Sequence, residues 1–470
     1  MRGLLFPALL CLPVAVLADA PPKPAEIPDT PAGHFISAFI TAYHSDDPED
    51  VRAYNRLYHR QTTAESWKDL YRMTGRITPV RIDARGPNGI TVLFAAERGD
   101  AFWKEAVSLD PADPMTVLDA GFSLADRPPE FAIPRVPYAE LDRMMAAKLA
   151  RDVAADRFAG TIMVERHGKV IYQQAVGLAD RAGKTPVTMS TRFRIGSANK
   201  MFTAISVLQL VEKGQIALDA TIGTYLPDYP NTDFAKTVTI RELLTHMGGA
   251  GDIFTPEYEA KRLEVKTPAD YVKLFGNRAQ DVSKDGKGAY ANYGFVLLGR
   301  IVEAVSGQNY YSYVREHIYA PADMRDSGSL PENVAVPNRS RGYTLNGEGK
   351  LVDNADTLPY RGSPAGGGYT TAGDMIRFAD ALRSGKLLSK ALLAQATSPQ
   401  RPDGWYGFGF LISGQGVGRN WGHGGGAPGM NAAFRVYPEL DAVVVALANL
   451  DALSADDEAD FYANRMPLGE

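Results

Sequence analysis

The chain has 470 residues, of which 45% are hydrophobic and 22% are charged, a composition typical of a globular protein with room for two or three domains. Its net charge of −5 at pH 7 gives no electrostatic basis for binding nucleic acid. The single cysteine, Cys11, lies in the N-terminal segment, and neither a cysteine cluster nor a His-Glu-x-x-His motif indicates a metal site. We therefore expect no metal, no cofactor and no intramolecular disulfide.

The first 20 residues have the pattern of a secretory signal peptide. Arg2 precedes an apolar run from Leu4 to Leu17, and Ala18-Asp19-Ala20 supplies the small residues of a cleavage site. The apolar run is short for a membrane span. We expect residues 1–20 to be removed, leaving a secreted or periplasmic protein without stable membrane insertion; a retained N-terminal anchor is the alternative. Residues 21–32 predict a proline-rich linker.

Residues 33–127 predict a small α+β domain. Apolar residues recur at helical spacing up to about Met73, and four runs with the alternation of strands follow. This order of elements resembles the cone-shaped fold of nuclear-transport-factor-like domains. The sequence shows no convergent set of polar side chains here, so we expect an accessory or dimerisation module, with substrate gating as the alternative. Pro128-Pro129 and Pro134 to Pro137 mark the boundary of this domain.

The remaining residues, 135–470, predict a second α+β domain. A helix near Ala139 to Ala155 precedes a hairpin of two strands that begins at Gly160, and residues 215 to about 385 are mostly helical. Strand patterns return between Gly407 and Ile412 and continue toward the C-terminus. N-terminal and C-terminal strands can therefore share one antiparallel sheet, with helices on both faces and a helical subdomain between them.

The helix that begins near Ser197 carries the most informative motif. Ser197 and Lys200 form the only Ser-x-x-Lys of the chain, and the apolar helix that follows should end at Gly214. Residues three apart lie on one face of a helix, so Lys200 can reach the Ser197 hydroxyl. A serine hydroxyl is a poor nucleophile unless such a base removes its proton. The positive potential of the helix N-terminus favours negative charge that develops there.

Two further motifs follow in chain order. Tyr290-Ala291-Asn292 precedes an amphipathic helix, and His423-Gly424-Gly425 leads into a strand-rich run. Ser-x-x-Lys, Tyr-x-Asn and a basic-x-Gly element, in this order, form the active-site set of the penicillin-recognising serine hydrolases. Residues 135 to about 450 resemble this family, in particular the branch of class C β-lactamases, D-alanyl-D-alanine carboxypeptidases and family esterases. The resemblance implies a β-lactamase/transpeptidase-like fold for this part of the chain.

The resemblance also implies the roles of the site residues. Ser197 would attack the carbonyl carbon of an ester or amide, and Lys200 and Tyr290 would share the general-base work. Asn292 would bind the lysine and the substrate. The backbone N–H groups of Ser197 and Gly426 would form the oxyanion hole, and the neighbouring glycines would let backbone and substrate approach closely. The full set of predicted site residues is Ser197, Lys200, Tyr290, Asn292, His423, Gly425 and Gly426.

His423 departs from the family pattern. Many relatives place a lysine here that binds the carboxylate of penicillins, whereas a histidine with a pKa near 6.5 is mostly neutral at pH 7. We therefore expect an esterase or D-peptidase acting on a small-molecule or peptide-like substrate, rather than an efficient β-lactamase. We also expect His423 to bind anionic substrates better below about pH 6.5. An acyl transferase and a non-enzymatic binding relative are the alternatives. His246 is interpreted as structural.

Overall fold

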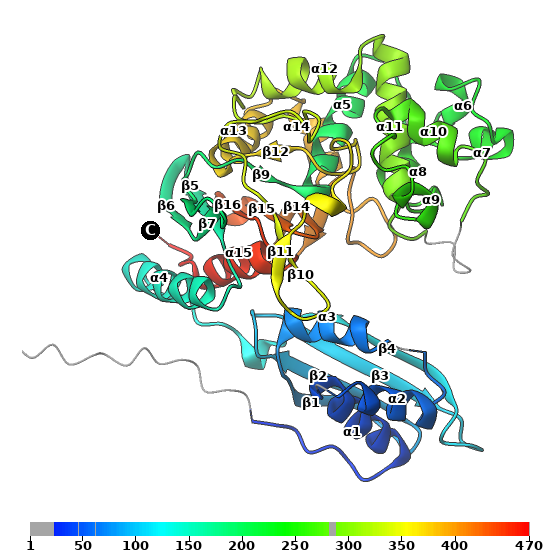
Figure 1. Cartoon of the computed structure of the whole chain (residues 1–470), viewed down its shortest axis with the longest axis vertical. Helices are drawn as coiled ribbons and strands as arrows, with labels where there is room; N and C mark the ends of the chain where they lie inside the picture. The colour runs from blue at the N-terminus through cyan, green and yellow to red at the C-terminus, as the bar shows by residue number, and fades with distance from the viewer. Residues whose placement is uncertain (1–22, 46, 62, 282–287, 470) are drawn as a thin grey trace, which may run out of the picture. The chain divides into compact units, whose positions relative to one another are not determined.

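The computed structural model describes residues 23–45, 47–61, 63–281 and 288–469 (Figure 1). The predicted signal peptide and the first two residues of the predicted linker lie outside the described residues. The chain divides into two units, the first ending at Ile133 and the second beginning at Pro134. Within the described residues, no helix is long and apolar enough to span a bilayer.

The first unit consists of three helices followed by four strands. Its elements are α1 (Pro31–His44), α2 (Pro48–Leu57), α3 (Ala64–Thr74), β1 (Ile77–Arg85), β2 (Gly89–Ala96), β3 (Phe102–Leu109), β4 (Val117–Ala125) and a 3₁₀ turn, η1 (Pro129–Phe131). The strands form one antiparallel sheet in the order β1-β2-β3-β4. Phe35 and Phe39 of α1 are buried in the same core as Val92 and Phe94 of the sheet. The predicted order of helices and strands is confirmed.

A six-stranded antiparallel sheet organises the second unit, with strand order β13-β14-β15-β16-β5-β6. Its strands are β5 (Gly160–Arg166), β6 (Lys169–Val176), β13 (Leu411–Ser413), β14 (Asn420–Ala427), β15 (Met430–Tyr437) and β16 (Ala442–Ala448). Ala446 of β16 lies opposite Ile162 of β5, so N-terminal and C-terminal strands share one sheet, as predicted. The strand predicted from Gly407 is shorter than expected, because Gly409 has a φ of 77°, which is incompatible with extended backbone.

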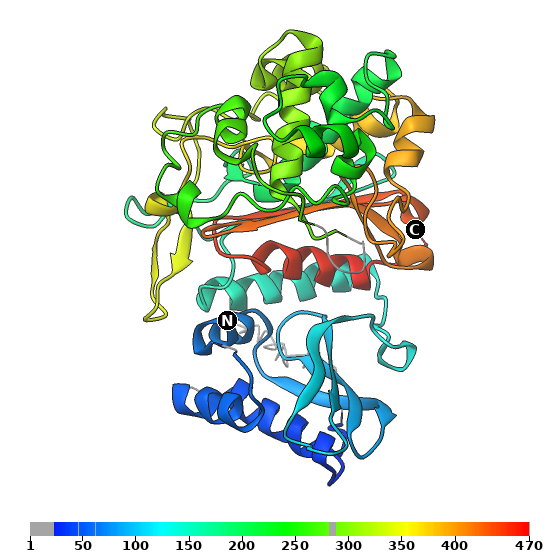
Figure 2. The same cartoon turned by 90° about the vertical axis from the view of Figure 1, so that its right-hand side faces the viewer.

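Helices cover both faces of this sheet. They are α4 (Tyr138–Ala154), α5 (Lys200–Glu212), α13 (Ala372–Arg383) and α15 (Ser454–Arg465). Successive side chains of a strand point to opposite faces. Val443 and Val445 of β16 accordingly belong to the core that contains α5 and α13, whereas Val444 and Ala446 belong to the core that contains α4 and α15. Figure 2 shows α4 and α15 side by side on one face of the sheet and the helical subdomain on the other.

The helical subdomain and its loops lie between β6 and β13. Their elements are β7 (Leu178–Asp180), β8 (Thr185–Pro186), β9 (Phe193–Arg194), η2 (Gly196–Asn199), α6 (Ile222–Tyr225), α7 (Thr232–Thr237), α8 (Ile240–Leu244), α9 (Pro256–Glu259), α10 (Pro268–Phe275), α11 (Asn292–Ser306), α12 (Tyr310–Val314), η3 (Arg315–Tyr319), β10 (Tyr343–Leu345), β11 (Leu351–Asp353), η4 (Ala355–Thr357), β12 (Tyr369–Thr370) and α14 (Lys390–Ala396). Two 3₁₀ turns, η5 (Gly416–Gly418) and η6 (Pro438–Leu440), lie between strands of the sheet. Ser197 lies in the 3₁₀ turn η2, directly before the α-helix that starts at Lys200.

We predict that the second unit folds by itself, because its two main hydrophobic cores are formed by residues that follow Pro134. Limited proteolysis should cut between residues 126 and 137, next to the predicted proline boundary. The released C-terminal fragment should keep a cooperative thermal transition and a reactive Ser197. A fragment that unfolds as soon as it is released would show that the two units need each other for stability.

Candidate active site

Lys200 is the centre of the candidate active site. Its side chain is fully buried, and its Nζ lies 3.1 Å from the Oγ of Ser197. Nζ also donates hydrogen bonds to Oδ1 of Asn292 at 2.7 Å and to the carbonyl oxygen of Ala365 at 2.5 Å. Burial lowers the pKa of Lys200 well below its usual value of 10.5, although the negative charge of Asp252 opposes this shift. The structure thus brings the predicted serine, lysine and asparagine together.

The carbonyl group of Ala365 is held in place by the helix that carries the lysine. Nδ2 of Asn199 donates a hydrogen bond to the carbonyl of Ser363 at 3.0 Å, and Oγ1 of Thr203 donates one to the carbonyl of Pro364 at 2.7 Å. Three consecutive carbonyl groups of the loop are therefore bound by side chains of η2 and α5. This arrangement fixes the acceptor of the lysine relative to the serine.

Tyr290 lies beside the lysine, with Nζ of Lys200 4.7 Å from the centroid of the tyrosine ring. The side chain of Ser197 is close enough to the Tyr290 hydroxyl to affect its pKa. Burial raises the pKa of Tyr290 far above its usual value of 10, and this effect outweighs the influence of Ser197, which lowers the pKa. Tyr290 is therefore a neutral phenol at pH 7, able to donate a proton but not present as a phenolate base.

His246 supports the backbone of the Tyr-x-Asn motif. Its ring lies against the ring of Tyr290, with centroids 4.1 Å apart, and its Nδ1 accepts a hydrogen bond from the backbone N–H of Ala291 at 3.0 Å. Burial lowers the pKa of His246 well below 6.5, so the ring is neutral and its Nε2 carries the proton. These contacts agree with the interpretation of His246 as a structural residue.

The glycines of β14 lie directly against the turn that carries Ser197. A Cβ atom on Gly425 would lie 1.8 Å from the carbonyl oxygen of Ile195 and 2.9 Å from the backbone nitrogen of Ser197. Similarly, a Cβ atom on Gly196 would lie 3.0 Å from the backbone nitrogen of Gly426. Strand and turn therefore approach more closely than side chains would allow, and the backbone nitrogens of Ser197 and Gly426 lie on the two facing segments.

His423 is buried in the sheet rather than open to solvent. Its Nδ1 donates a hydrogen bond to the carbonyl of Gly424 at 2.5 Å, and its Nε2 accepts one from the hydroxyl of Tyr406 at 3.0 Å. Burial lowers the pKa of His423 to about 3. The expectation that this ring gains a proton near pH 6.5 is therefore wrong. Since both ring nitrogens bind protein groups, the ring has no N–H left for a substrate carboxylate.

Comparison with known proteins identifies the family of the second unit. The Beta-lactamase family model matches residues 141–466, which lie within the second unit. The chain belongs to the beta-lactamase family. This result confirms the predicted family and fold of the second domain.

Relatives of the beta-lactamase family match most of their own length. Penicillin-binding protein 4 of Amycolatopsis lactamdurans is 30% identical over 307 residues, covering 59% of this chain and 77% of that protein. Esterase EstB of Burkholderia gladioli is 31% identical over 296 residues, covering 54% of this chain and 75% of the esterase. A crystal structure of a penicillin binding protein from Bacillus halodurans aligns with a TM-score of 0.60 and 29% identity, covering 66% of this chain and 97% of that one.

Two side chains at the site were not predicted from the sequence. Oδ1 of Asp252 accepts a hydrogen bond from Nδ2 of Asn292 at 2.9 Å. Asp252 follows the glycine-rich run after His246. A carboxylate at the end of such a run is the sequence feature from which this residue could have been predicted. The sequence did not single out Tyr406, whose hydroxyl binds His423, because it stands just before the strand predicted from Gly407 and belongs to no motif.

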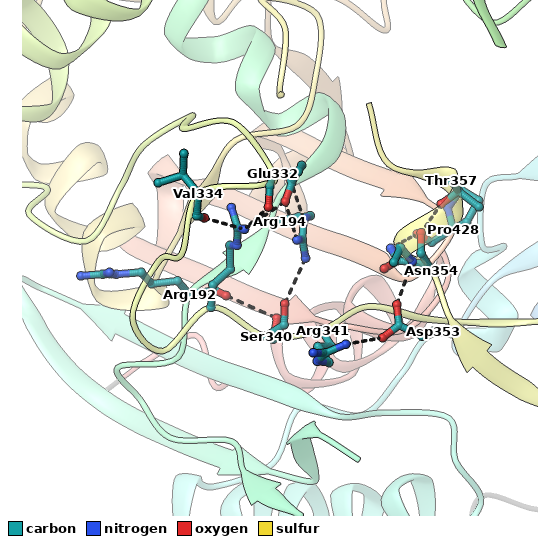
Figure 3. Close-up of polar contacts among 12 residues, drawn as sticks. Arg192, Arg194, Glu332, Val334, Ser340, Arg341, Asp353, Asn354, Thr357 and Pro428 are labelled. Atoms are coloured by element: carbon teal, nitrogen blue, oxygen red, sulfur yellow. Dashed lines mark hydrogen bonds and ion pairs between the residues drawn. The ribbon is translucent and has the colours of Figure 1, made fainter. Parts of the chain in front are cut away.

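Ion pairs fix the strand that leads into the turn η2 (Figure 3). Arg194 of β9 binds Glu332 with both Nε and Nη2, at 2.9 and 2.6 Å, and its Nη1 donates to the carbonyl of Ser340 at 3.0 Å. Further along the same loop, Nδ2 of Asn354 donates to the carbonyl of Pro428, in the turn between β14 and β15, at 2.7 Å. The segment from Glu332 to Asn354 thus contacts both β9, which leads into the turn with Ser197, and the turn that follows β14.

We predict that Gly425→Ala disables the site, whereas Gly424→Ala is tolerated. A Cβ atom at Gly425 collides with backbone, but one at Gly424 has its nearest neighbour at 3.6 Å. Overpacking of this kind costs about 1–3 kcal/mol, so Gly425→Ala should lower the thermal midpoint and abolish labelling of Ser197 by a fluorophosphonate. The two variants should be compared by calorimetry and mass spectrometry. Equal behaviour of the two would contradict the close approach.

We predict that His423 makes the protein sensitive to acid. Its pKa in the folded state lies below the unfolded value of about 6.5, so the unfolded state takes up the proton first and stability is lost as the pH falls below about 6.5. Urea denaturation at several pH values between about 4 and 8 should give a steeper loss for wild type than for His423→Gln. Equal slopes would show that His423 does not carry this acid sensitivity.

Proposed function

We propose that this protein is a serine hydrolase that forms an acyl-enzyme on Ser197 from an ester or amide and then releases the acyl group to water. The observation that carries the proposal is the buried amine of Lys200, which lies 3.1 Å from Ser197 Oγ and also contacts two fixed carbonyl oxygens. A base with a lowered pKa beside a hydroxyl is the arrangement that activates a serine. The second unit's membership of the beta-lactamase family supports the same reaction class.

The two carbonyl acceptors orient the lysine for base catalysis. A neutral amine has two hydrogens and one lone pair. When the hydrogens bind Oδ1 of Asn292 and the carbonyl of Ala365, the lone pair is left for the hydroxyl of Ser197. Burial keeps a large fraction of Lys200 neutral at a lower pH than usual. The amine can therefore accept the Ser197 proton as Oγ attacks the substrate carbonyl.

We assign the protonation of the leaving group to Tyr290. Its raised pKa keeps it a phenol, and it lies near both Ser197, which affects its pKa, and the amine of Lys200, so its proton is available beside the reacting groups. As the bond between carbonyl carbon and leaving group breaks, the phenol gives its proton to the leaving oxygen or nitrogen and regains one from the lysine ammonium. This division differs from the shared general-base work that the family resemblance implied.

The backbone N–H groups of Ser197 and Gly426 are proposed as the oxyanion hole. The close approach of β14 to the turn η2 supports this assignment. Donors fixed in this way stabilise the negative charge of the tetrahedral intermediate without reorganisation, and one such donor contributes about 3–4 kcal/mol in serine hydrolases. Gly425 serves the site by having no side chain between the two segments.

We propose that the substrates are esters or amides other than penicillins. Neutral His423 supplies no positive charge at the position where relatives use lysine, which favours an esterase or D-peptidase over an efficient β-lactamase. The similarity to esterase EstB supports ester hydrolysis. The N-terminal pattern of residues 1–20 supports export of the enzyme.

We predict that Ser197→Ala and Lys200→Met remove hydrolysis of activated esters by several orders of magnitude, as loss of coupled catalytic groups does. Lys200→Met keeps the volume of the side chain but removes the lone pair. Ser206→Ala is the matched control, since the hydroxyl of this buried serine of α5 donates to the carbonyl of Phe202 and has no other hydrogen bond among the described residues. Turnover and fluorophosphonate labelling followed by mass spectrometry check the prediction. A folded Ser197→Ala that still turns over would refute the proposal.

A further inference from the structure

Asp252 places a carboxylate at the open side of the candidate active site. Its Oδ1 accepts hydrogen bonds from Nδ2 of Asn292 at 2.9 Å and from the backbone N–H of Ile253 at 2.6 Å. Asn292 is in turn bound to the lysine, and the lysine to the serine. Asn292 and the lysine are buried, whereas Asp252 is exposed. The carboxylate is therefore the solvent-facing end of the polar chain that reaches the nucleophile.

Within the part of the chain that the structure describes, no cationic side chain pairs with the carboxylate of Asp252. The nearby guanidinium of Arg278 donates to the backbone carbonyl of Asp252 at 2.7 Å, not to its carboxylate. Among the described residues, none donates a hydrogen bond to Oδ2 or forms an ion pair with this carboxylate. Its negative charge also acts on the site, because it opposes the lowering of the Lys200 pKa and adds to the raising of the Tyr290 pKa.

We propose that Asp252 determines the charge preference of the site, by binding an ammonium group that the acyl part of the substrate carries beside the scissile carbonyl. The favoured substrates are then aminoacyl esters or amides with a free amine. This inference rests on the proposed function, since it concerns substrates of the Ser197 reaction. A carboxylate prefers a cationic donor to a neutral one because charge-assisted hydrogen bonds are about twice as strong.

Binding of such a substrate would also favour the chemical step. In the free enzyme, Asp252 stabilises the ammonium form of Lys200, which is the form that cannot act as a base. An ammonium bound to Asp252 neutralises that charge and makes it easier for Lys200 to lose its proton. The same contact therefore binds the substrate and helps to activate the base. A substrate carboxylate in this position would be repelled by Asp252 and would add to the negative charge that opposes the lowering of the Lys200 pKa.

The test compares three thiobenzyl esters of the same shape on the full chain. D-Alanine thiobenzyl ester carries the ammonium, the isobutyric ester replaces it by a methyl group, and the half-ester of methylmalonic acid replaces it by a carboxylate. The variant is Asp252→Asn, which keeps an oxygen for Asn292 and Ile253 but removes the charge. Asp281→Asn is the matched control, because among the described residues this exposed carboxylate has no hydrogen bond to the loop of Asp252, which it contacts through its backbone: its N–H donates to the carbonyl of Gly249 at 2.8 Å.

Wild type should prefer the ammonium ester to the methyl ester in kcat/KM, and the methyl ester to the carboxylate ester. Asp252→Asn should lower the ammonium-to-methyl ratio about tenfold, or about 1.4 kcal/mol, whereas Asp281→Asn should leave the ratio unchanged. A ratio that is the same in wild type and Asp252→Asn, with both enzymes active, would refute this inference alone and leave Asp252 only positioning Asn292. No Ser197-dependent turnover of any ester by wild type would refute the proposed function and this inference with it.

Discussion

The hydrogen bonds of one buried amine, that of Lys200, are the constraint on which the site depends. A polar group without a partner inside a protein costs several kcal/mol, and the amine of Lys200 is fully buried. It is satisfied because Asn292 and Ala365 are brought to it from two distant segments, while Ser197 lies three residues before it in the adjoining turn. Any change that separates these segments leaves the amine unpaired, so stability and catalysis are linked at this point of the fold.

The architecture of the second unit follows from this requirement. The turn η2 and helix α5 bind the loop that ends at Ala365 through Asn199 and Thr203. Strand β14 of the sheet packs closely against η2 because Gly425 has no side chain. Arg194 and Glu332 hold the strand before the nucleophile. Helices and sheet thus form a rigid support, and the exposed carboxylate of Asp252 is the part of the polar chain that remains for the substrate.

The sequence predicted those parts of the site that depend on local geometry. Ser197 and Lys200 lie three residues apart at the start of a helix, so their spacing indicated a pair, and the family resemblance then singled out Tyr290 and Asn292 at the start of the later helix. The partners that depend on tertiary contacts were not predicted: the carbonyl of Ala365, the carboxylate of Asp252 and the hydroxyl of Tyr406. The pKa of His423 was misjudged for the same reason, because its burial is a property of the folded sheet.

The same limit applies to the fold. Alternation of apolar and polar residues predicted the elements of the first unit and the main strands of the second, but neither the short strands β10 to β12 nor the break at Gly409 that shortens β13. The most direct test of the account is a measurement of the Lys200 pKa by NMR of protein labelled with carbon-13 at the lysine side chains, with Lys200→Met to assign the signal. The account predicts a midpoint well below 10.5. A midpoint at or above 10.5 would contradict the role of Lys200 as the base that activates Ser197.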